Sequence, residues 1–201
     1  MIELKVLQAV RLKGRIGPDD IAATTGEDPT TVAEAVGAAT GAGLLVEGKT
    51  IRISPEGRAR LSELLAAERE NADQAAIDAA YDEFRGINAD FKALVSDWQL
   101  KNGKPNPHDD EAYDSAVLAR LADVHQRVTP VNAAVANEIP RLAGYSDKLQ
   151  AALAKVQAGE TTWLTRPIID SYHTVWFELH EELILAAGLT REGEAQAGHA
   201  H

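Results

Sequence analysis

The chain has 201 residues and a mass of 21.6 kDa, which is enough for one large domain or two small ones. It contains no cysteine, which excludes disulfides, thiol nucleophiles and cysteine-ligated zinc. The formal net charge of −11 argues against broad electrostatic attraction to nucleic acid or anionic membranes. The acidity belongs mainly to residues 71–201, which hold 11 basic and 20 acidic side chains, whereas residues 1–70 hold 9 and 11.

The first residues, MIELKVLQAVRLKG, lack the basic, apolar and small-residue order of a signal peptide. No apolar run approaches the roughly 20 residues that a membrane-spanning helix needs. We therefore expect a cytoplasmic protein that does not interact with membranes.

Three helices are predicted at the start of the chain. Apolar side chains recur at helical spacing over residues 2–13. A second, short helix is expected from Pro18, because proline suits the first turn of a helix. A third helix is expected from Pro29 to about Ala42, with Asp28 as its N-cap.

A β-hairpin is predicted after the third helix. Two short β-runs, Leu44–Val46 and Thr50–Ile53, flank a tip formed by residues 47–49. Ser54 and Pro55 then begin another helix. Three helices, a hairpin wing and a further helix are the element order of a winged helix-turn-helix.

The run GLLVEGKTIRISPEGRARL resembles the wing and following helix of bacterial winged-helix regulators of the MarR type. The resemblance covers about the first 70 residues. It implies a DNA-binding-like domain over residues 1–70, and hence a transcriptional regulator.

The third helix raises a question for this function, because it contains no lysine or arginine. Bases are read by side chains near the start of the recognition helix, whereas phosphates are bound by basic residues around it. The candidate base-reading residues are Thr30, Thr31 and Glu34, and the candidate phosphate contacts are Lys13, Arg15, Lys49 and Arg52. This set predicts weak, strongly salt-dependent binding to double-stranded DNA.

Residues 71–190 are predicted to form an all-helical dimerisation or effector domain. One helical seam repeats with alternating spacings of four and three residues, and it consists of Ile77, Tyr81, Phe84, Asn88, Phe91, Val95 and Trp98. Such a seam packs either inside its own bundle or against a second copy of the chain. We predict a homodimer to which the seam contributes.

Three more helical stretches follow a loop, KNGKPNPHDD, at residues 111–128, 141–158 and 168–187. Residues 191–201 are small and polar, which predicts a disordered tail. The sequence therefore indicates a mainly α protein: an N-terminal winged helix-turn-helix, a long helix and a C-terminal helical bundle.

Catalytic motifs are absent from the sequence, and the carboxylates are expected at solvent-facing helix positions. His173 and His180 lie two helical turns apart, about 10.5 Å along the axis, and Phe177 occupies the position where a second metal ligand would be needed. A metal site would also require His125. We expect histidines that form hydrogen bonds at the bundle surface, and a protein without metal, cofactor or enzymatic activity.

Five large aromatic residues are candidates for a pocket that holds a small apolar effector: Trp98, Tyr145, Trp163, Tyr172 and Trp176. Core packing is the alternative role for these side chains.

A second function stays open beside DNA binding. The run SYHTVWFELHEEL resembles helical extensions of some actinobacterial phosphoenolpyruvate-utilising proteins. This resemblance favours a winged-helix module that binds a protein partner, in a phosphoenolpyruvate-utilising system, without binding DNA.

Overall fold

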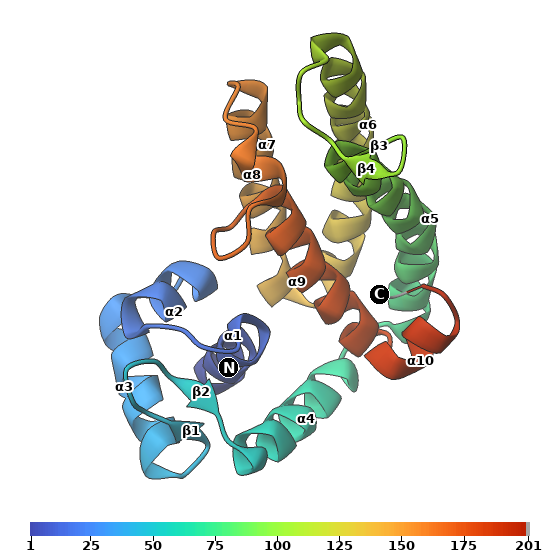
Figure 1. Cartoon of the computed structure of the whole chain (residues 1–201). Coiled ribbons are helices and arrows are strands. Elements are labelled where there is room, and N and C mark those ends of the chain that lie inside the picture. Colours follow the sequence, from blue (N-terminus) through green and yellow to red (C-terminus); the bar gives the residue numbers. More distant parts are fainter. Residues whose placement is uncertain (200–201) are drawn as a thin grey trace. The chain divides into compact units, whose positions relative to one another are not determined.

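The computed structural model describes residues 1–199 of the chain. The protein is mainly α-helical, with two small antiparallel hairpins among the described residues. The chain divides into two compact units, Met1–Asn71 and Ala72–His201 (Figure 1). Each unit has its own hydrophobic interior.

The first unit contains four helices and one hairpin. They are α1 (Ile2–Lys13), α2 (Pro18–Thr25), α3 (Pro29–Gly41), β1 (Leu45–Val46), β2 (Arg52–Ile53) and α4 (Pro55–Arg69). Both predicted N-caps are present. The Asp28 carboxylate accepts a hydrogen bond from the Thr31 amide at 2.9 Å, and the Ser54 hydroxyl accepts one from the Gly57 amide at 2.9 Å.

A third extended segment, which the sequence did not indicate, lies beside the hairpin. The Ile16 amide donates to the Ile51 carbonyl at 3.2 Å, and the Ile51 amide donates to the Ile16 carbonyl at 2.9 Å. The connection between α1 and α2 is therefore hydrogen-bonded to the hairpin. Ile16, Ile51 and Ile53 are buried on one face of this small sheet. Because side chains alternate between the two faces of a strand, Arg15 and Arg52 point to the other face, and both are exposed.

A close backbone approach joins α4 to the hairpin. Ser54 donates from its hydroxyl to the Gly43 carbonyl at 2.7 Å. A Cβ atom built on Gly57 would lie 2.0 Å from the carbonyl oxygen of Leu44, so only glycine fits at this position. The run SPEG therefore caps α4 and also sets the distance between α4 and the chain that enters β1.

The second unit is built around four helices: α5 (Gln74–Gln99), α6 (Glu111–Glu138), α7 (Gly144–Gln157) and α9 (Tyr172–Ala186). Helix α5 packs against α6, α6 against α7, α7 against α9, and α9 against α5, so the four helices enclose one core (Figure 1). Shorter elements connect or follow them: β3 (Leu100–Lys101), β4 (Lys104–Pro105), η1 (Pro140–Leu142), α8 (Thr162–Thr165) and α10 (Arg191–Gln196).

The helical seam of α5 lies in this core. All seven seam residues, from Ile77 to Trp98, have relative exposures of 8% or less. They pack against the other helices of the same chain, which is the alternative to the dimer interface. The alternative role, packing inside the bundle, therefore accounts for the large aromatic side chains of the seam, which are already covered within one chain. The homodimer itself stays a prediction.

Helix α6 extends ten residues beyond the predicted end at Val128, through Pro130 to Glu138. Proline normally ends a helix because it lacks an amide hydrogen and crowds the preceding turn. Pro130 leaves the carbonyl of Gln126, four residues earlier, without a hydrogen-bond partner in the helix. Both residues are exposed, so this carbonyl can bond to water. Val131 and Val135 are buried and continue the packing stripe.

Two helix starts also differ from the sequence expectation. Helix α9 begins at Tyr172, because the Ser171 hydroxyl caps it by accepting from the Thr174 amide. Ile168, the predicted start, is fully exposed and has a φ of 76°, outside the helical range. Residues 140–142 form the short helix η1, and α7 begins after it at Gly144.

The prediction of a disordered tail is wrong for residues 191–199, because the structure contains the short helix α10 there. Thr190 caps this helix by accepting a hydrogen bond from the Gly193 amide at 3.2 Å. Glu194 is buried against the bundle, with a relative exposure of 5%. Residues 200–201 of the expected tail lie outside the described residues.

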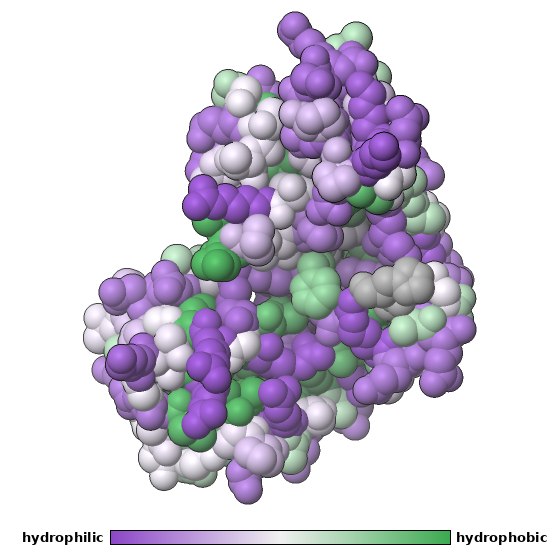
Figure 2. All heavy atoms as spheres, viewed as in Figure 1, coloured by the Kyte–Doolittle hydropathy of each residue, from purple (hydrophilic) through white to green (hydrophobic). Residues whose placement is uncertain are grey.

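Hydrophilic residues cover most of the face of the second unit that is visible in Figure 2. Among the described residues, no helix has both the length and the apolar character required to cross a membrane.

Candidate nucleic-acid interface

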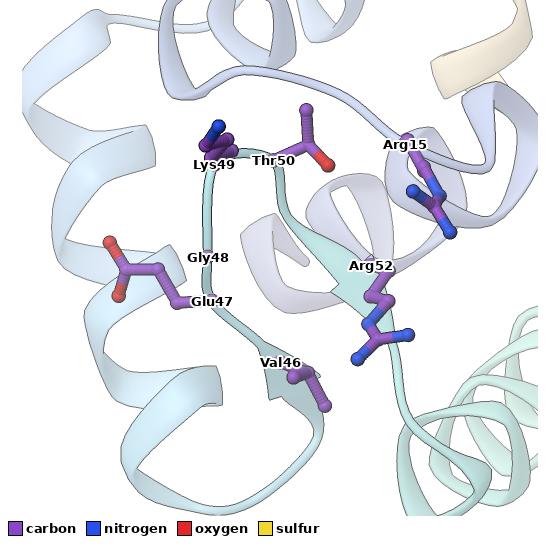
Figure 3. A pocket seen from close by; sticks show the side chains of 7 residues that line it. All are labelled: Arg15, Val46, Glu47, Gly48, Lys49, Thr50 and Arg52. Carbon is purple, nitrogen blue, oxygen red and sulfur yellow. The ribbon is translucent and has the colours of Figure 1, made fainter.

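Two arginines face each other across the hairpin of the first unit. The hydrogen-bonded pair Ile16–Ile51 places Arg15 directly opposite Arg52, on the face away from the core. Figure 3 shows both guanidinium groups on the same side of the hairpin. Like charges in directly opposed cross-strand positions destabilise a sheet, so this pairing does not serve the fold.

Arg15, Lys49 and Arg52 line an open hollow of about 240 Å³ at the hairpin. Val46 also lines the hollow, and Glu47 is the one acidic residue in the lining. In Figure 3 the Glu47 carboxylate extends away from Arg15 and Arg52, toward the other side of the hairpin. The side of the hollow that carries the arginines is therefore cationic.

These three basic side chains form no ion pair within residues 1–199. Other basic residues of the unit behave differently: Lys5 lies 2.5 Å from a Glu27 carboxylate oxygen, and Arg60 lies 3.0 Å from one of Glu3. Exposed cations without an internal partner are available to an external anion. Lys13, the fourth predicted phosphate contact, is half-buried and lies outside this hollow.

The predicted base-reading residues lie together at the start of α3. Thr30, Thr31 and Glu34 are all exposed. However, the Thr31 hydroxyl donates to the Asp28 carboxylate at 3.2 Å, so its one proton is used in the helix cap. Thr31 can still accept a hydrogen bond, and Thr30 and Glu34 form no side-chain bond among the described residues.

The three candidate metal-binding histidines do not converge. His125 bonds to the Tyr172 hydroxyl at 3.2 Å and to the Gln150 side chain at 3.0 Å. His180 bonds to the Tyr81 hydroxyl at 3.3 Å, whereas the His173 ring packs 5.9 Å from that of Phe91. In the part of the chain that the structure describes, no group of three or more His, Cys, Asp or Glu residues is arranged to hold a metal ion.

Two expectations about polar residues in the second unit are wrong. His180 is not at the bundle surface but buried, with a relative exposure of 5%. Four carboxylates are buried rather than solvated: Glu178, Glu181, Glu182 and Glu194. Burial of a carboxylate requires a partner, and Arg141 lies 2.7 Å from Glu182 while Arg85 lies 2.8 Å from Glu194.

The five aromatic residues predicted to line an effector pocket do not gather at one place. Tyr172 and Trp176 stack in the core with ring centroids 6.0 Å apart, and this is the one ring contact among the five over residues 1–199. Trp98 packs instead on His108, and Trp163 lies under the Lys155 ammonium group. The Tyr145 hydroxyl points to Glu182. Core packing, the alternative role, describes Trp98, Tyr145, Tyr172 and Trp176.

Two features of the first unit thus stand out: a cationic hollow at the hairpin and a non-basic, exposed start of α3. Known proteins add nothing to this description, because no protein-family model, curated protein or solved structure matches the chain.

Proposed function

We propose that the first unit is a winged helix-turn-helix module that binds double-stranded DNA, and that the chain is a transcriptional regulator. The observation that carries this proposal is the set of three unpaired basic side chains, Arg15, Lys49 and Arg52, around one hollow of the hairpin. Their phosphate contacts supply the affinity, because backbone neutralisation dominates protein–DNA binding.

The element order of the first unit supports this assignment. Three helices, a two-stranded hairpin and a fourth helix follow one another within Met1–Asn71. The hairpin is the wing in this interpretation, and the exposed start of α3 contacts the major groove. Thr30 and Glu34 provide few base contacts, so the predicted binding discriminates weakly among sequences.

A second candidate function is protein binding without DNA, and the composition of α3 favours it. The helix carries no basic residue. Its exposed positions include the small residues Ala33, Gly37, Ala38 and Gly41, which would let a partner helix approach closely. A partner protein would cover this face, and the hairpin cations would then contribute little to the affinity.

Binding of the full chain to a labelled duplex of random sequence, measured by anisotropy at several salt concentrations, tests the proposal. Each neutralised phosphate contributes about −0.9 to the slope of log K against log [salt], so three contacts predict a slope of about −2.7. The double variant Lys49→Glu/Arg52→Glu should weaken binding to all sequences and reduce the slope to about −0.9.

The matched control is the double variant Lys104→Glu/Arg166→Glu. It makes the same change in net charge with two exposed basic residues of the second unit. We expect this control to retain most of the affinity and the wild-type slope. Equal loss in both double variants would show only a net-charge effect, and the absence of any binding by the wild type at low salt would favour the protein-binding function.

A further inference from the structure

We propose that the helical bundle of the second unit carries a carboxylate-binding site, which the chain's own C-terminal segment fills with Glu194 as a releasable internal ligand. The site consists of Tyr81, Arg85, Asn88 and His180. The C-terminal segment is defined as residues 190–199. This proposal does not depend on DNA binding by the first unit.

The Glu194 carboxylate is held by a fork of hydrogen bonds. Arg85 donates from Nη2 to one carboxylate oxygen at 2.8 Å and from Nε to the other at 3.2 Å. The Tyr81 hydroxyl donates to the same second oxygen at 2.7 Å. A bidentate guanidinium with a phenol is a geometry that selects a planar, charged carboxylate.

His180 completes the site from the opposite helix. The Tyr81 hydroxyl has one proton, and that proton is donated to Glu194. His180, whose Nε2 lies 3.3 Å from the Tyr81 oxygen, must therefore donate to it. The neutral imidazole thus orients Tyr81 toward the carboxylate. Burial of His180 disfavours its charged form and lowers its pKa, which fits this neutral state.

Asn88 links the C-terminal segment to the core. Its amide nitrogen donates to the backbone carbonyl of His199 at 3.1 Å, and its carbonyl accepts from the Trp176 indole at 2.9 Å. Tyr81, Arg85 and Asn88 are spaced four and three residues apart on α5, so they form one row along the helix. The side chains of this row bind both the Glu194 carboxylate and the backbone carbonyl of His199.

The C-terminal segment has no apolar anchor. Glu194 is the one residue of 190–199 that is buried, and the apolar side chains of the segment are alanines. Arg191 adds an ion pair with Glu181 and lies over the Phe177 ring at 4.6 Å. Docking therefore depends on polar contacts, which are individually weak in water, and such a segment opens locally while the bundle stays folded.

The charged state of Glu194 fits this role. Burial alone would raise the pKa of its carboxyl, but the hydrogen bonds from Arg85 and Tyr81 outweigh burial and hold the pKa below its usual value. The segment therefore presents a carboxylate, not a carboxylic acid, at neutral pH. When the segment leaves, Arg85 and Tyr81 become available to a carboxylate from another source.

Backbone NMR relaxation of the full chain tests the internal ligand. In the wild type, the order parameters of residues 191–197 should be near 0.85, as in rigid backbone. Glu194→Gln removes the charge and should lower the ratio of docked to released segment by about 10-fold to 100-fold, with order parameters below about 0.6. Glu192→Gln, an exposed position on the same helix, is the matched control and should change nothing.

A second experiment tests the carboxylate site itself. The Glu194→Gln chain is titrated with sodium acetate, with a synthetic peptide of residues 190–199, and with sodium chloride at equal ionic strength. Saturable shifts of the Arg85 and Trp176 side-chain resonances with acetate indicate a small carboxylate ligand, and shifts with the peptide alone indicate an acidic segment. Either result supports the site when Tyr81→Phe, added to the same chain, weakens binding at least about threefold.

Two outcomes would overturn the proposal. The first is a Glu194→Gln segment as rigid as that of the wild type and the Glu192→Gln control. The second is a Glu194→Gln chain whose resonances respond equally to acetate, peptide and chloride. Tyr81→Phe keeps the ring and removes one hydroxyl, so the site can be probed even if larger changes at Arg85 disturb folding.

Discussion

His180 lies inside the second unit, between polar and aromatic neighbours. Its ring centroid is 6.1 Å from that of Tyr81 and 5.1 Å from that of Phe84. Burial, and then the nearby charge of Arg191, lowers its pKa from 6.5 to about 4. In the unfolded chain the same imidazole titrates near its ordinary value.

This lowered pKa predicts a pH dependence of stability. Between pH 6.5 and about 4 the unfolded chain binds a proton at position 180 and the folded chain does not. The free energy of unfolding is therefore highest above pH 6.5, as far as His180 is concerned. It decreases as the pH falls from 6.5 toward 4, by up to about 1.4 kcal/mol per pH unit. In His180→Asn this contribution to the slope should vanish. Denaturant unfolding at several pH values measures it, and equal slopes for both proteins would contradict the assignment.

Single residues differ in how far the sequence predicts them. Asp28 and Ser54 were predictable as caps, because a cap acts within three residues of its own position. Glu194 was not, because its partner Tyr81 lies 113 residues away and nothing near Glu194 indicates burial. The sequence signal that was available is the alignment of Tyr81, Arg85 and Asn88 on one helix face, since an arginine beside a buried seam needs an acidic partner.

The contact between α4 and the hairpin gives a prediction at the level of elements. Gly57→Ala would force a Cβ atom to within 2.0 Å of the Leu44 carbonyl oxygen. The helix or the hairpin must then move, which should destabilise the first unit by about 1–3 kcal/mol. Gly37→Ala, in the same unit, is the control, because no atom of a neighbouring residue lies within 4 Å of the place that its Cβ would occupy. It should stabilise α3 by about 0.5–1 kcal/mol.

Denaturant unfolding of both glycine variants, followed by circular dichroism, provides the measurement. A Gly57→Ala protein as stable as the wild type would mean that the close approach between α4 and Leu44 is not required.

Element boundaries were predicted where local signals exist and missed where tertiary contacts decide. Helix α3 begins at the predicted Pro29, after its Asp28 cap. Helix α6 continues past Pro130 because Val131 and Val135 extend a stripe whose partners belong to other helices. The pairing of Ile16 with Ile51 joins segments 35 residues apart, and it is this pairing that brings Arg15 to Arg52. Arg15, Lys49 and Arg52 were thus named from the sequence as candidate phosphate contacts, but the position of Arg15 opposite Arg52 was not predicted.

At the scale of the whole molecule, the burial of the α5 seam changes what a mutation there should do. Phe84 is fully buried and packs on Trp176 with ring centroids 5.1 Å apart. Phe84→Ala should therefore destabilise the second unit by about 3–5 kcal/mol, because it leaves a cavity in a core. If the seam instead joined two copies, the variant would become monomeric without losing its fold.

Sedimentation and thermal unfolding of Phe84→Ala together separate these outcomes. We expect a lower melting temperature and a sedimentation coefficient for the folded protein that equals that of the wild type. A folded variant that dissociates from a wild-type dimer would contradict the intramolecular core.

The short connection between α9 and α10 sets a concentration scale for the whole molecule. Helix α9 ends at Ala186 and α10 is capped at Thr190, so Glu194 is tethered within a few residues of the site that it fills. A short tether gives an effective concentration in the millimolar range. A competing carboxylate in solution must therefore reach millimolar levels, or make additional contacts, before it displaces the segment. The length of this tether, more than the strength of the hydrogen bonds from Arg85 and Tyr81, therefore sets the concentration of external carboxylate at which the segment is displaced.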